Sequence, residues 1–300
     1  MIAVDWGTSS LRVYRLDAGG AVIAQRRADL GIAACQGQFA ATLLAQIEGW
    51  DDPCIVLSGM VGSRQGWMEV PYVDCPADAA TLAAGVVSLQ PPELPGRTLW
   101  FVPGVADRSN SQTPDVMRGE EAQICALIEA LNHGSHMICL PGTHSKWVTV
   151  NQGRIDGIST AMTGEVYAVM RQHSLLGRSM NQEETRFDAF AFDAGLRRSG
   201  MAGGLLHHLF GVRTAALFDQ LSASELPSYL SGLLIGHEIR ASDLFQRVPR
   251  PVQVHLIGSD RLLSAYAHAL VSLGVGVQRH SEQLAATGIH RIARQRGLID

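Results

Sequence analysis

Two Gly-Thr turns carry the residue types best suited to binding an anion. The run Gly7-Thr8-Ser9-Ser10-Leu11-Arg12-Val13 recurs 135 residues later as Gly142-Thr143-His144-Ser145-Lys146-Trp147-Val148, with Gly, Thr, Ser and Val in step. The surrounding apolar pattern predicts a strand, a tight turn and a strand in both places. Such a turn directs backbone N–H groups and small hydroxyls toward one point, which suits a phosphate. Either turn alone reads as an ordinary hairpin, but the recurrence favours one phosphate site in each half of the chain.

Carboxylates and polar loops near strand ends supply further chemistry. Asp5 ends the strand before the first turn, where a carboxylate suits a hydrated magnesium ion. The loop 58–64 follows an apolar run, and ligands of open α/β sheets bind at the carboxyl ends of strands. Glu120 and Glu121 begin a predicted helix, although acidic residues in a first turn also simply favour the helix dipole. Lys146 is equally consistent with a phosphate contact and with a solvated strand position.

These segments require a scaffold of alternating strands and helices. We predict strands at 2–5, 11–17, 21–27, 54–57, 99–102, 146–150, 154–160, 252–257 and 275–278. We predict helices at 39–50, 77–85, about 120–131, from 163 onward, at 183–246 with short breaks, at 262–273 and at 281–296. Thr163 is expected to cap its helix. The pattern predicts an α/β protein with two domains, 1–133 and 134–300, whose terminal helix is able to pack back on the first domain.

Composition excludes several classes of protein. The 300 residues are 46% hydrophobic and 17% charged, which allows a sizeable core. A net charge of −4 argues against a nucleic-acid partner. The first residues lack a signal-peptide pattern, and no window approaches the ~20 apolar residues of a membrane span, so we expect a soluble cytoplasmic protein. The five cysteines are scattered singly, which predicts reduced thiols and no zinc site.

Four runs carry a resemblance to a known family. They are Leu57–Trp67, Met117–Glu121, Pro141–Trp147 and Leu233–Glu238. With the duplicated turn, they resemble the sugar kinase, Hsp70 and actin superfamily and, within it, the 2-dehydro-3-deoxygalactonokinase family. The resemblance implies two ribonuclease-H-like (actin-like ATPase) domains with a nucleotide cleft between them. It also implies transfer of phosphate from ATP, with Mg²⁺, to the 6-hydroxyl of 2-dehydro-3-deoxy-D-galactonate in galactonate breakdown.

The resemblance assigns roles to particular residues. For phosphate and magnesium at the first turn it implies Asp5, Gly7, Thr8 and Ser9. For the nucleotide in the second half it implies Gly142, Thr143, Ser145, Lys146, Gly258 and Ser259. For the sugar acid we expect contacts from Ser58, Gly59, Met60, Arg64, Trp67 and Arg118. Arg64 and Arg118 compete as the fork that binds the substrate carboxylate.

The catalytic base is expected just before the second turn. Related glycerol and xylulose kinases carry Gly-Asp-Gln at the start of a helix there, and this chain has Gly119-Glu120-Glu121. We expect Glu120 to act as the base, with Asp5 as the second catalytic carboxylate, while Glu121 and Asp115 remain open alternatives. His144 and His237 are expected to be structural.

Two other functions remain open at the level of sequence. One is a kinase for a neighbouring sugar acid such as 2-dehydro-3-deoxygluconate. The other is a non-catalytic nucleotide-binding switch on the same fold, although the sequence has no DNA-binding or partner-binding extension. Epimer preference, homo-oligomerisation and the extent of domain closure are not predicted.

Overall fold

The chain folds into two compact units. A computed structural model describes residues 1–110, 112–131, 133–183, 186–242 and 253–299. Unit 1 comprises Met1–Ser135, Val148–Ile158 and Ser281–Asp300, and unit 2 comprises His136–Trp147 and Ser159–His280. The predicted α/β class is confirmed. The predicted domain limits 1–133 and 134–300 stay a prediction.

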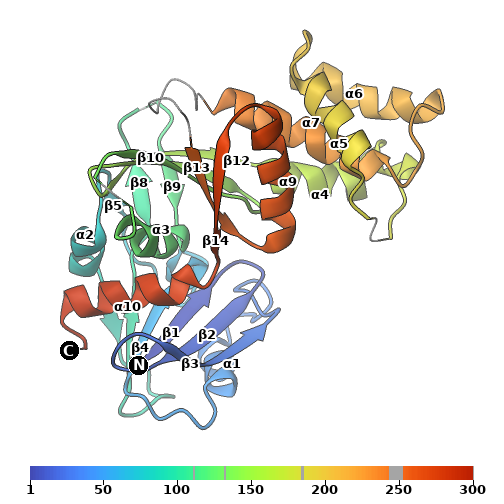
Figure 1. Ribbon diagram of the computed structural model, residues 1–300. Helices are drawn as coiled ribbons and strands as arrows, with labels where there is room; N and C mark the ends of the chain where they lie inside the picture. Colours follow the sequence, from blue (N-terminus) through green and yellow to red (C-terminus); the bar gives the residue numbers. More distant parts are fainter. Residues whose placement is uncertain (111, 132, 184–185, 243–252, 300) are drawn as a thin grey trace. The chain divides into compact units, whose positions relative to one another are not determined.

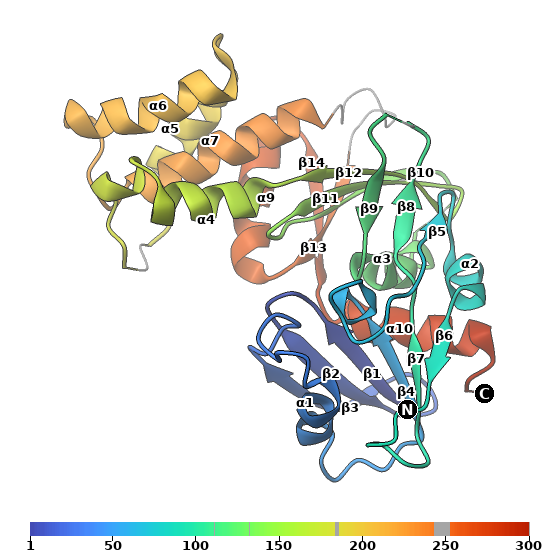
Figure 2. The ribbon, with the colours of Figure 1, turned by 180° about the vertical axis from the view of Figure 1, so that it is seen from behind.

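The main sheet of unit 1 begins with the predicted antiparallel meander (Figure 2). Its strands lie in the order β3-β2-β1-β4-β7-β6. Their bounds are β1 Ile2–Trp6, β2 Leu11–Leu16, β3 Val22–Ala28, β4 Cys54–Ser58, β6 Val87–Leu89 and β7 Thr98–Phe101. Strands β1, β4 and β7 are parallel, and Asp5 pairs in register with Ser58. The first turn and the loop after β4 therefore leave the sheet at the same edge.

Aromatic side chains fill the core on one face of this sheet. Trp6 packs edge-on against Phe39 of helix α1 (Phe39–Gln46), with ring centroids 5.7 Å apart. The predicted helix 39–50 ends earlier than expected. Gly49 takes a φ of 77°, a left-handed conformation that cannot continue a right-handed helix.

The rest of unit 1 packs around the helix that begins at Glu120. A small sheet contains β5 Val73–Asp74, β8 Val105–Asp107 and β9 Asp115–Met117. The helices are α2 Ala79–Ala84, α3 Glu120–Ile128, α10 Leu284–Arg296 and the short 3₁₀ helix η1 Met60–Gly62. Helix α10 lies along α3 (Figures 1 and 2), so close that a Cβ at Gly288 would lie 1.7 Å from the Ala122 carbonyl oxygen. Arg291 donates to the carbonyls of Cys125 and Ala126, which fixes α3 further.

A second sheet contains the second Gly-Thr turn. Its order is β12-β11-β10-β13-β14. The bounds are β10 Ser135–Leu140, β11 Ser145–Asn151, β12 Arg154–Ala161, β13 Gln253–Gly258 and β14 Gly276–Ser281. Strands β10 and β13 are parallel, so the second turn, after β10, and the loop after β13 share an edge. The predicted strand-turn-strand pattern is confirmed for both copies of the repeat.

Unit 2 also contains several helices (Figure 1). They are α4 Thr163–His173, η2 Gly177–Ser179, α5 Ala189–Ser199, α6 Gly204–Leu217, α7 Leu226–Ala241 and α9 Asp260–Ser272. Helices α5 and α7 touch backbone to backbone, because a Cβ at Gly195 would lie 2.1 Å from the Tyr229 oxygen and one at Gly232 would lie 2.0 Å from the Phe192 oxygen. The predicted helical region 183–246 is confirmed where it is described; residues 184–185 and 243–246 lie outside the described residues, as does residue 252 of the predicted strand 252–257.

One helix start differs from expectation. The N-cap of α4 is Met162, so the prediction that Thr163 caps this helix is wrong. The Thr163 side chain instead hydrogen-bonds the buried carboxylate of Glu238. Among the described helices, none is both long and apolar enough to span a lipid bilayer.

Candidate active site

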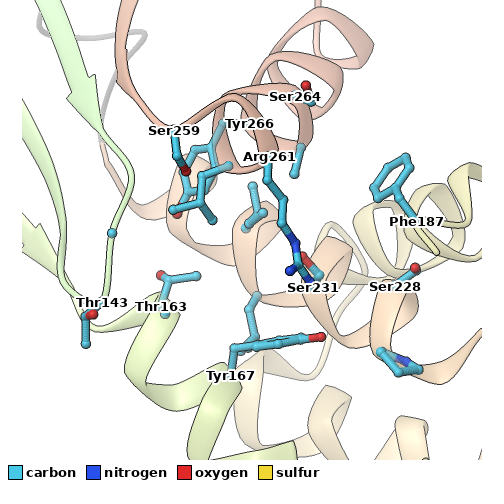
Figure 3. A pocket seen from close by; sticks show the side chains of 17 residues that line it. Thr143, Thr163, Tyr167, Phe187, Ser228, Ser231, Ser259, Arg261, Ser264 and Tyr266 are labelled. Carbon is cyan, nitrogen blue, oxygen red and sulfur yellow. The ribbon is translucent and has the colours of Figure 1, made fainter. Parts of the chain in front are cut away.

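Unit 2 contains a cavity of about 640 Å³ at the edge of its sheet (Figure 3). Its lining comes from the second turn, from α4, α7 and α9, and from Phe187. The side chains of Tyr167 and Arg261 reach into it from α4 and α9. Apolar walls with a few hydroxyls and one cationic side chain suit a flat ligand that ends in a charged group.

The second turn forms one end of this cavity. Gly142 and Thr143 line it, and the Glu165 N–H donates to the Thr143 oxygen at 2.9 Å. Helix α4 starts so close to the turn that a Cβ at Gly164 would lie 2.3 Å from the Gly142 oxygen. The turn and the first residues of α4 are thus held together, and the unpaired N–H groups of a helix start favour an anion there.

Of the other residues predicted to bind the nucleotide, only Ser259 belongs to the cavity lining. Ser259 lines the cavity, whereas Gly258 does not belong to its lining. Ser145 is fully buried, with its hydroxyl oxygen 2.7 Å from the Tyr266 hydroxyl. Lys146 is also buried, and its Nζ donates to the Thr160 hydroxyl at 2.8 Å. Neither Ser145 nor Lys146 belongs to the lining of the cavity, and their phosphate contacts stay predictions.

The first turn in unit 1 combines exposed hydroxyls with a charged cluster. Thr8 and Ser9 are exposed, and the Gly7 N–H closes the turn on the Ser10 oxygen at 2.9 Å. The neighbouring Asp5 carboxylate is buried and accepts from Arg12 Nη1 at 3.0 Å.

The charged cluster contains one guanidinium, from Arg12, and the carboxylates of Asp5 and Glu282. Arg12 Nη2 donates to Glu282 at 2.7 Å, so one guanidinium serves two carboxylates. Burial raises the pKa of Asp5, and the Arg12 guanidinium opposes that rise.

Glu120 and Glu121 occupy different environments. Glu121 is fully buried; it accepts from the Ser58 hydroxyl at 3.1 Å and from the Gly119 N–H at 2.6 Å. Burial first, and then the charge of Glu120, raise the pKa of Glu121 to about 8. Glu120 is half-buried and accepts from the Arg118 N–H at 3.1 Å. Glu121 therefore ties the Ser58 loop to α3, while Glu120 remains partly accessible.

Glycines allow this loop and helix to meet. Gly59 and Gly119 have φ values of 104° and 112°. A Cβ at Gly119 would lie 3.2 Å from the Gly59 Cα. Asp115, by contrast, pairs with Asp107 at the other end of β9, so the structure separates it from Ser58 and Glu121.

The two arginines expected to compete for a carboxylate also differ. The Arg64 side chain is 85% exposed and pairs with Glu69. Arg118 is 8% exposed, donates to the Val70 oxygen at 2.7 Å and lies 4.3 Å from the centre of the Tyr72 ring. Its Nε and Nη1 have no acceptor among the described residues. A buried cation without a carboxylate partner suits an anionic ligand.

The remaining predicted substrate residues pack within the loop. Met60 lies in η1 and packs partly buried against the core. Trp67 stacks on Phe39 at 6.0 Å and meets Phe101 edge-on at 6.2 Å. The structure thus gives Trp67 a packing role, and its contact with substrate stays a prediction. His144 bonds Glu165 and His237 bonds His208, in agreement with their expected structural roles.

Comparisons with known proteins show the family of this chain. The model of the 2-keto-3-deoxy-galactonokinase family matches residues 5–292. The chain belongs to that family. It is 35% identical over 299 residues to a probable 2-dehydro-3-deoxygalactonokinase of Rhizobium meliloti (strain 1021), covering 97% of this chain and 96% of the relative. It is 32% identical over 296 residues to the 2-dehydro-3-deoxygalactonokinase of Escherichia coli (strain K12), covering 97% of each chain.

Solved structures extend the comparison to the fold. A Sinorhizobium meliloti protein described as a 2-dehydro-3-deoxygalactonokinase matches with a TM-score of 0.87 at 36% identity, over 98% of each chain. The activator of 2-hydroxyisocaproyl-CoA dehydratase from Clostridium difficile, solved with bound ADPNP, matches in fold alone, with a TM-score of 0.54 at 13% identity over 99% of this chain and 96% of that one. The predicted actin-like ATPase fold with two domains is confirmed, and membership of a kinase family implies the use of ATP. The expectation of a nucleotide cleft between the domains stays a prediction.

Most residues that line the cavity were not predicted from the sequence. Tyr167 follows Thr163 by four residues, and Ser231 follows Ser228 by three, so each pair shares a face of its helix. The spacing of these hydroxyl-bearing residues along their helices was the only sequence pattern that pointed to these residues of the cavity. Phe187 and Arg261 offered no comparable pattern.

Proposed function

We propose that this protein phosphorylates the 6-hydroxyl of 2-dehydro-3-deoxy-D-galactonate with ATP, giving 2-dehydro-3-deoxy-6-phosphogalactonate. The observation that carries the proposal is the cavity of unit 2 with a phosphate-type turn at one end, in a chain of this kinase family. We place the reaction in the cytoplasm, as expected from the sequence.

ATP occupies the cavity of unit 2 in this proposal. The adenine lies between apolar walls that include Tyr167 and Leu234, and the phosphates reach Gly142 and Thr143. Arg261 contributes positive charge near the nucleotide. Backbone N–H groups bind phosphate without the rotamer ordering that a lysine requires, which supports the turn as the main phosphate contact.

The sugar acid binds in unit 1 next to Glu120. Arg118 binds its carboxylate, because the guanidinium is buried and two of its nitrogens lack acceptors among the described residues. Glu120 takes the proton of the 6-hydroxyl, since it is half-buried and next to Arg118. Glu121 is a poorer base, because both of its oxygens are engaged and its pKa of about 8 keeps it protonated at neutral pH. Positioning and charge neutralisation supply most of the catalysis in phosphoryl transfer.

Magnesium fits the residues that are present. Mg²⁺ keeps several waters and takes one or two carboxylates together with substrate phosphates. The described residues contain no cluster of three or more His, Cys, Asp or Glu side chains that could hold a metal ion. Asp5 is the carboxylate that would hold it, and the bound ion would neutralise phosphate charge.

Steady-state kinetics test the function. With ATP and Mg²⁺, we expect ADP formation that depends on 2-dehydro-3-deoxygalactonate, with a lower kcat/KM for the 2-dehydro-3-deoxygluconate epimer. A higher kcat/KM for the gluconate epimer would assign the neighbouring substrate instead. ATP binding without turnover on any 2-keto-3-deoxy sugar acid would support the non-catalytic switch.

The carboxylate contact has its own matched pair of variants. Arg118→Met should raise the KM for the sugar acid roughly tenfold to hundredfold, because a charged hydrogen-bonded pair is lost, and should leave the KM for ATP unchanged. Arg64→Met removes an exposed arginine and should leave both constants near those of the unsubstituted protein. The reverse pattern would transfer the role to Arg64.

A further inference from the structure

Glu238 is a buried carboxylate that no step of the proposed reaction uses. It lies on α7, is 7% exposed and ends the run Leu233–Glu238. Its Oε1 accepts from Trp147 Nε1 at 2.7 Å, and its Oε2 accepts from the Tyr266 hydroxyl at 2.7 Å. The Thr163 hydroxyl also hydrogen-bonds this carboxylate. Three donors, from Trp147, Tyr266 and Thr163, thus converge on one side chain.

These donors belong to the elements that surround the cavity. Ser145 and Trp147 begin β11 directly after the second turn. Thr163 is the first residue of α4, and Tyr266 lies on α9; both line the cavity. One carboxylate on α7 therefore connects the strand after the second turn, the start of α4 and the α9 wall of the cavity.

The connection also fixes the direction of the hydroxyl groups. A carboxylate only accepts, so Trp147, Tyr266 and Thr163 must all donate toward it. The Ser145 oxygen lies 2.7 Å from the Tyr266 hydroxyl, which extends the same network under the turn. Burying a charge is costly, and an apolar side chain would avoid that cost but leave these buried donors without acceptors.

We propose that Glu238 is the positioning residue of the nucleotide site. It draws the hydroxyls of Ser145, Thr163 and Tyr266 away from the ligand, so that the backbone N–H groups of the turn and the exposed Thr143 hydroxyl meet the phosphates. The inference rests on the proposed binding of ATP in this cavity. It assigns Ser145 to the support of the turn rather than to the phosphate.

Glu238→Gln changes the network without changing its volume. An amide has one acceptor oxygen and one donor nitrogen. Because Trp147 can only donate, the amide oxygen must face Trp147 and the nitrogen must face Tyr266. The Tyr266 hydroxyl must then accept and turn its hydrogen toward Ser145, which reverses the hydroxyl chain below the turn.

Kinetics of the full-length protein test the proposal. Glu238→Gln should raise the KM for ATP roughly tenfold or more, the loss of about one charged hydrogen bond, and leave the KM for the sugar acid within about twofold. Asp193→Asn, a carboxyl-to-amide change at an ion pair with His268 outside the cavity lining, is the control and should alter neither constant. A merely structural role would lower the active fraction without changing either KM. An unchanged KM for ATP, or an equal rise in both constants, overturns the proposal.

Two further variants keep the test decisive if Glu238→Gln fails to fold. Tyr266→Phe and Ser145→Ala each remove one hydroxyl of the network and should raise the KM for ATP roughly threefold. If both leave it unchanged, the proposal is wrong.

Calorimetric binding of a non-hydrolysable ATP analogue separates this result from the proposed function. An unsubstituted protein that binds the analogue but phosphorylates no sugar acid refutes the kinase activity, while the analogue Kd of Glu238→Gln still decides the role of Glu238.

Discussion

The two Gly-Thr turns share a sequence pattern and differ in the charge of the side chains around them. A glycine from elsewhere packs on each: a Cβ at Gly31 would lie 1.9 Å from the Thr8 oxygen, and one at Gly164 would lie 2.3 Å from the Gly142 oxygen. A neighbouring N–H also ties each turn, from Ile32 to Gly7 and from Glu165 to Thr143. The duplication therefore extends to how each turn is held.

Equivalent positions in the two turns reveal the difference. Arg12 and Trp147 occupy the same place in the repeat, and each donates to a buried carboxylate. Arg12 pairs with Asp5, the next-to-last residue of strand β1 in its own turn. Leu140 stands at the place equivalent to Asp5, and the carboxylate that Trp147 meets comes instead from Glu238 on α7. Charged side chains surround the first turn, whereas the second is supported by an uncharged donor of its own strand and a carboxylate from another helix. Under the proposed function, the surrounding side chains decide that one turn binds a metal and the other a nucleotide.

The largest expected effect separates proton transfer from nucleotide binding. Glu120→Gln should lower kcat by roughly 10²–10⁴, because the general base is lost, with the KM for ATP unchanged. Steady-state kinetics with Glu121→Gln alongside checks this. Should Glu121→Gln lose as much activity as Glu120→Gln while folding normally, Glu121 would share the chemistry.

Asp5→Asn removes the carboxylate that distinguishes the first turn from the second. We expect kcat to fall roughly hundredfold and the Mg²⁺ concentration for half-maximal activity to rise, since the ion loses its charged protein ligand. A magnesium titration at saturating ATP measures both quantities. Glu282→Gln, which removes a carboxylate paired with Arg27 and with the Nη2 group of Arg12, should have a much smaller effect. Equal effects of the two variants would remove the distinction between the turns.

Glycine replacements test how each turn is held. Gly31→Ala and Gly164→Ala insert a methyl group into backbone and should each lower the free energy of unfolding by roughly 1–3 kcal/mol, measured as a fall in Tm. Gly164→Ala should also raise the KM for ATP, and Gly31→Ala should not. Gly211→Ala, whose Cβ would meet nothing closer than 3.8 Å, is the control. A raised KM for ATP in Gly31→Ala would contradict the division of roles.

The last prediction concerns the dependence of stability on pH. The folded-state pKa of Glu121, about 8, lies above its ordinary value of 4.5, so the folded protein holds a proton that the unfolded chain releases between those values. The contribution of Glu121 to the free energy of unfolding therefore decreases as pH rises through this window, by up to ~1.4 kcal/mol per pH unit. Denaturation midpoints across the window should fall less steeply for Glu121→Gln than for the exposed control Glu129→Gln. Parallel curves would exclude the buried proton.

Local pattern predicted the turns and most strands, because these depend on residues near one another in sequence. The roles of Glu120 and Glu121 did not follow from sequence, since Ser58, which engages Glu121, lies 63 residues earlier. Ser145 shows the same limit. Residues 145–148 are all buried, so no alternation of polar and apolar residues revealed which way its hydroxyl points. Glu238 acts on Trp147 across 91 residues, a separation that no local pattern encodes.

The contact between α10 and α3 has a consequence for biosynthesis. Arg291 reaches the Cys125 carbonyl across 166 residues, and α10 belongs to unit 1. A nascent chain that already contains both Gly-Thr turns still lacks the surface on which the Glu120 helix rests. Until α10 is translated, the Ala122 face of α3 is uncovered, and unit 1 completes its fold only after unit 2 has been synthesised.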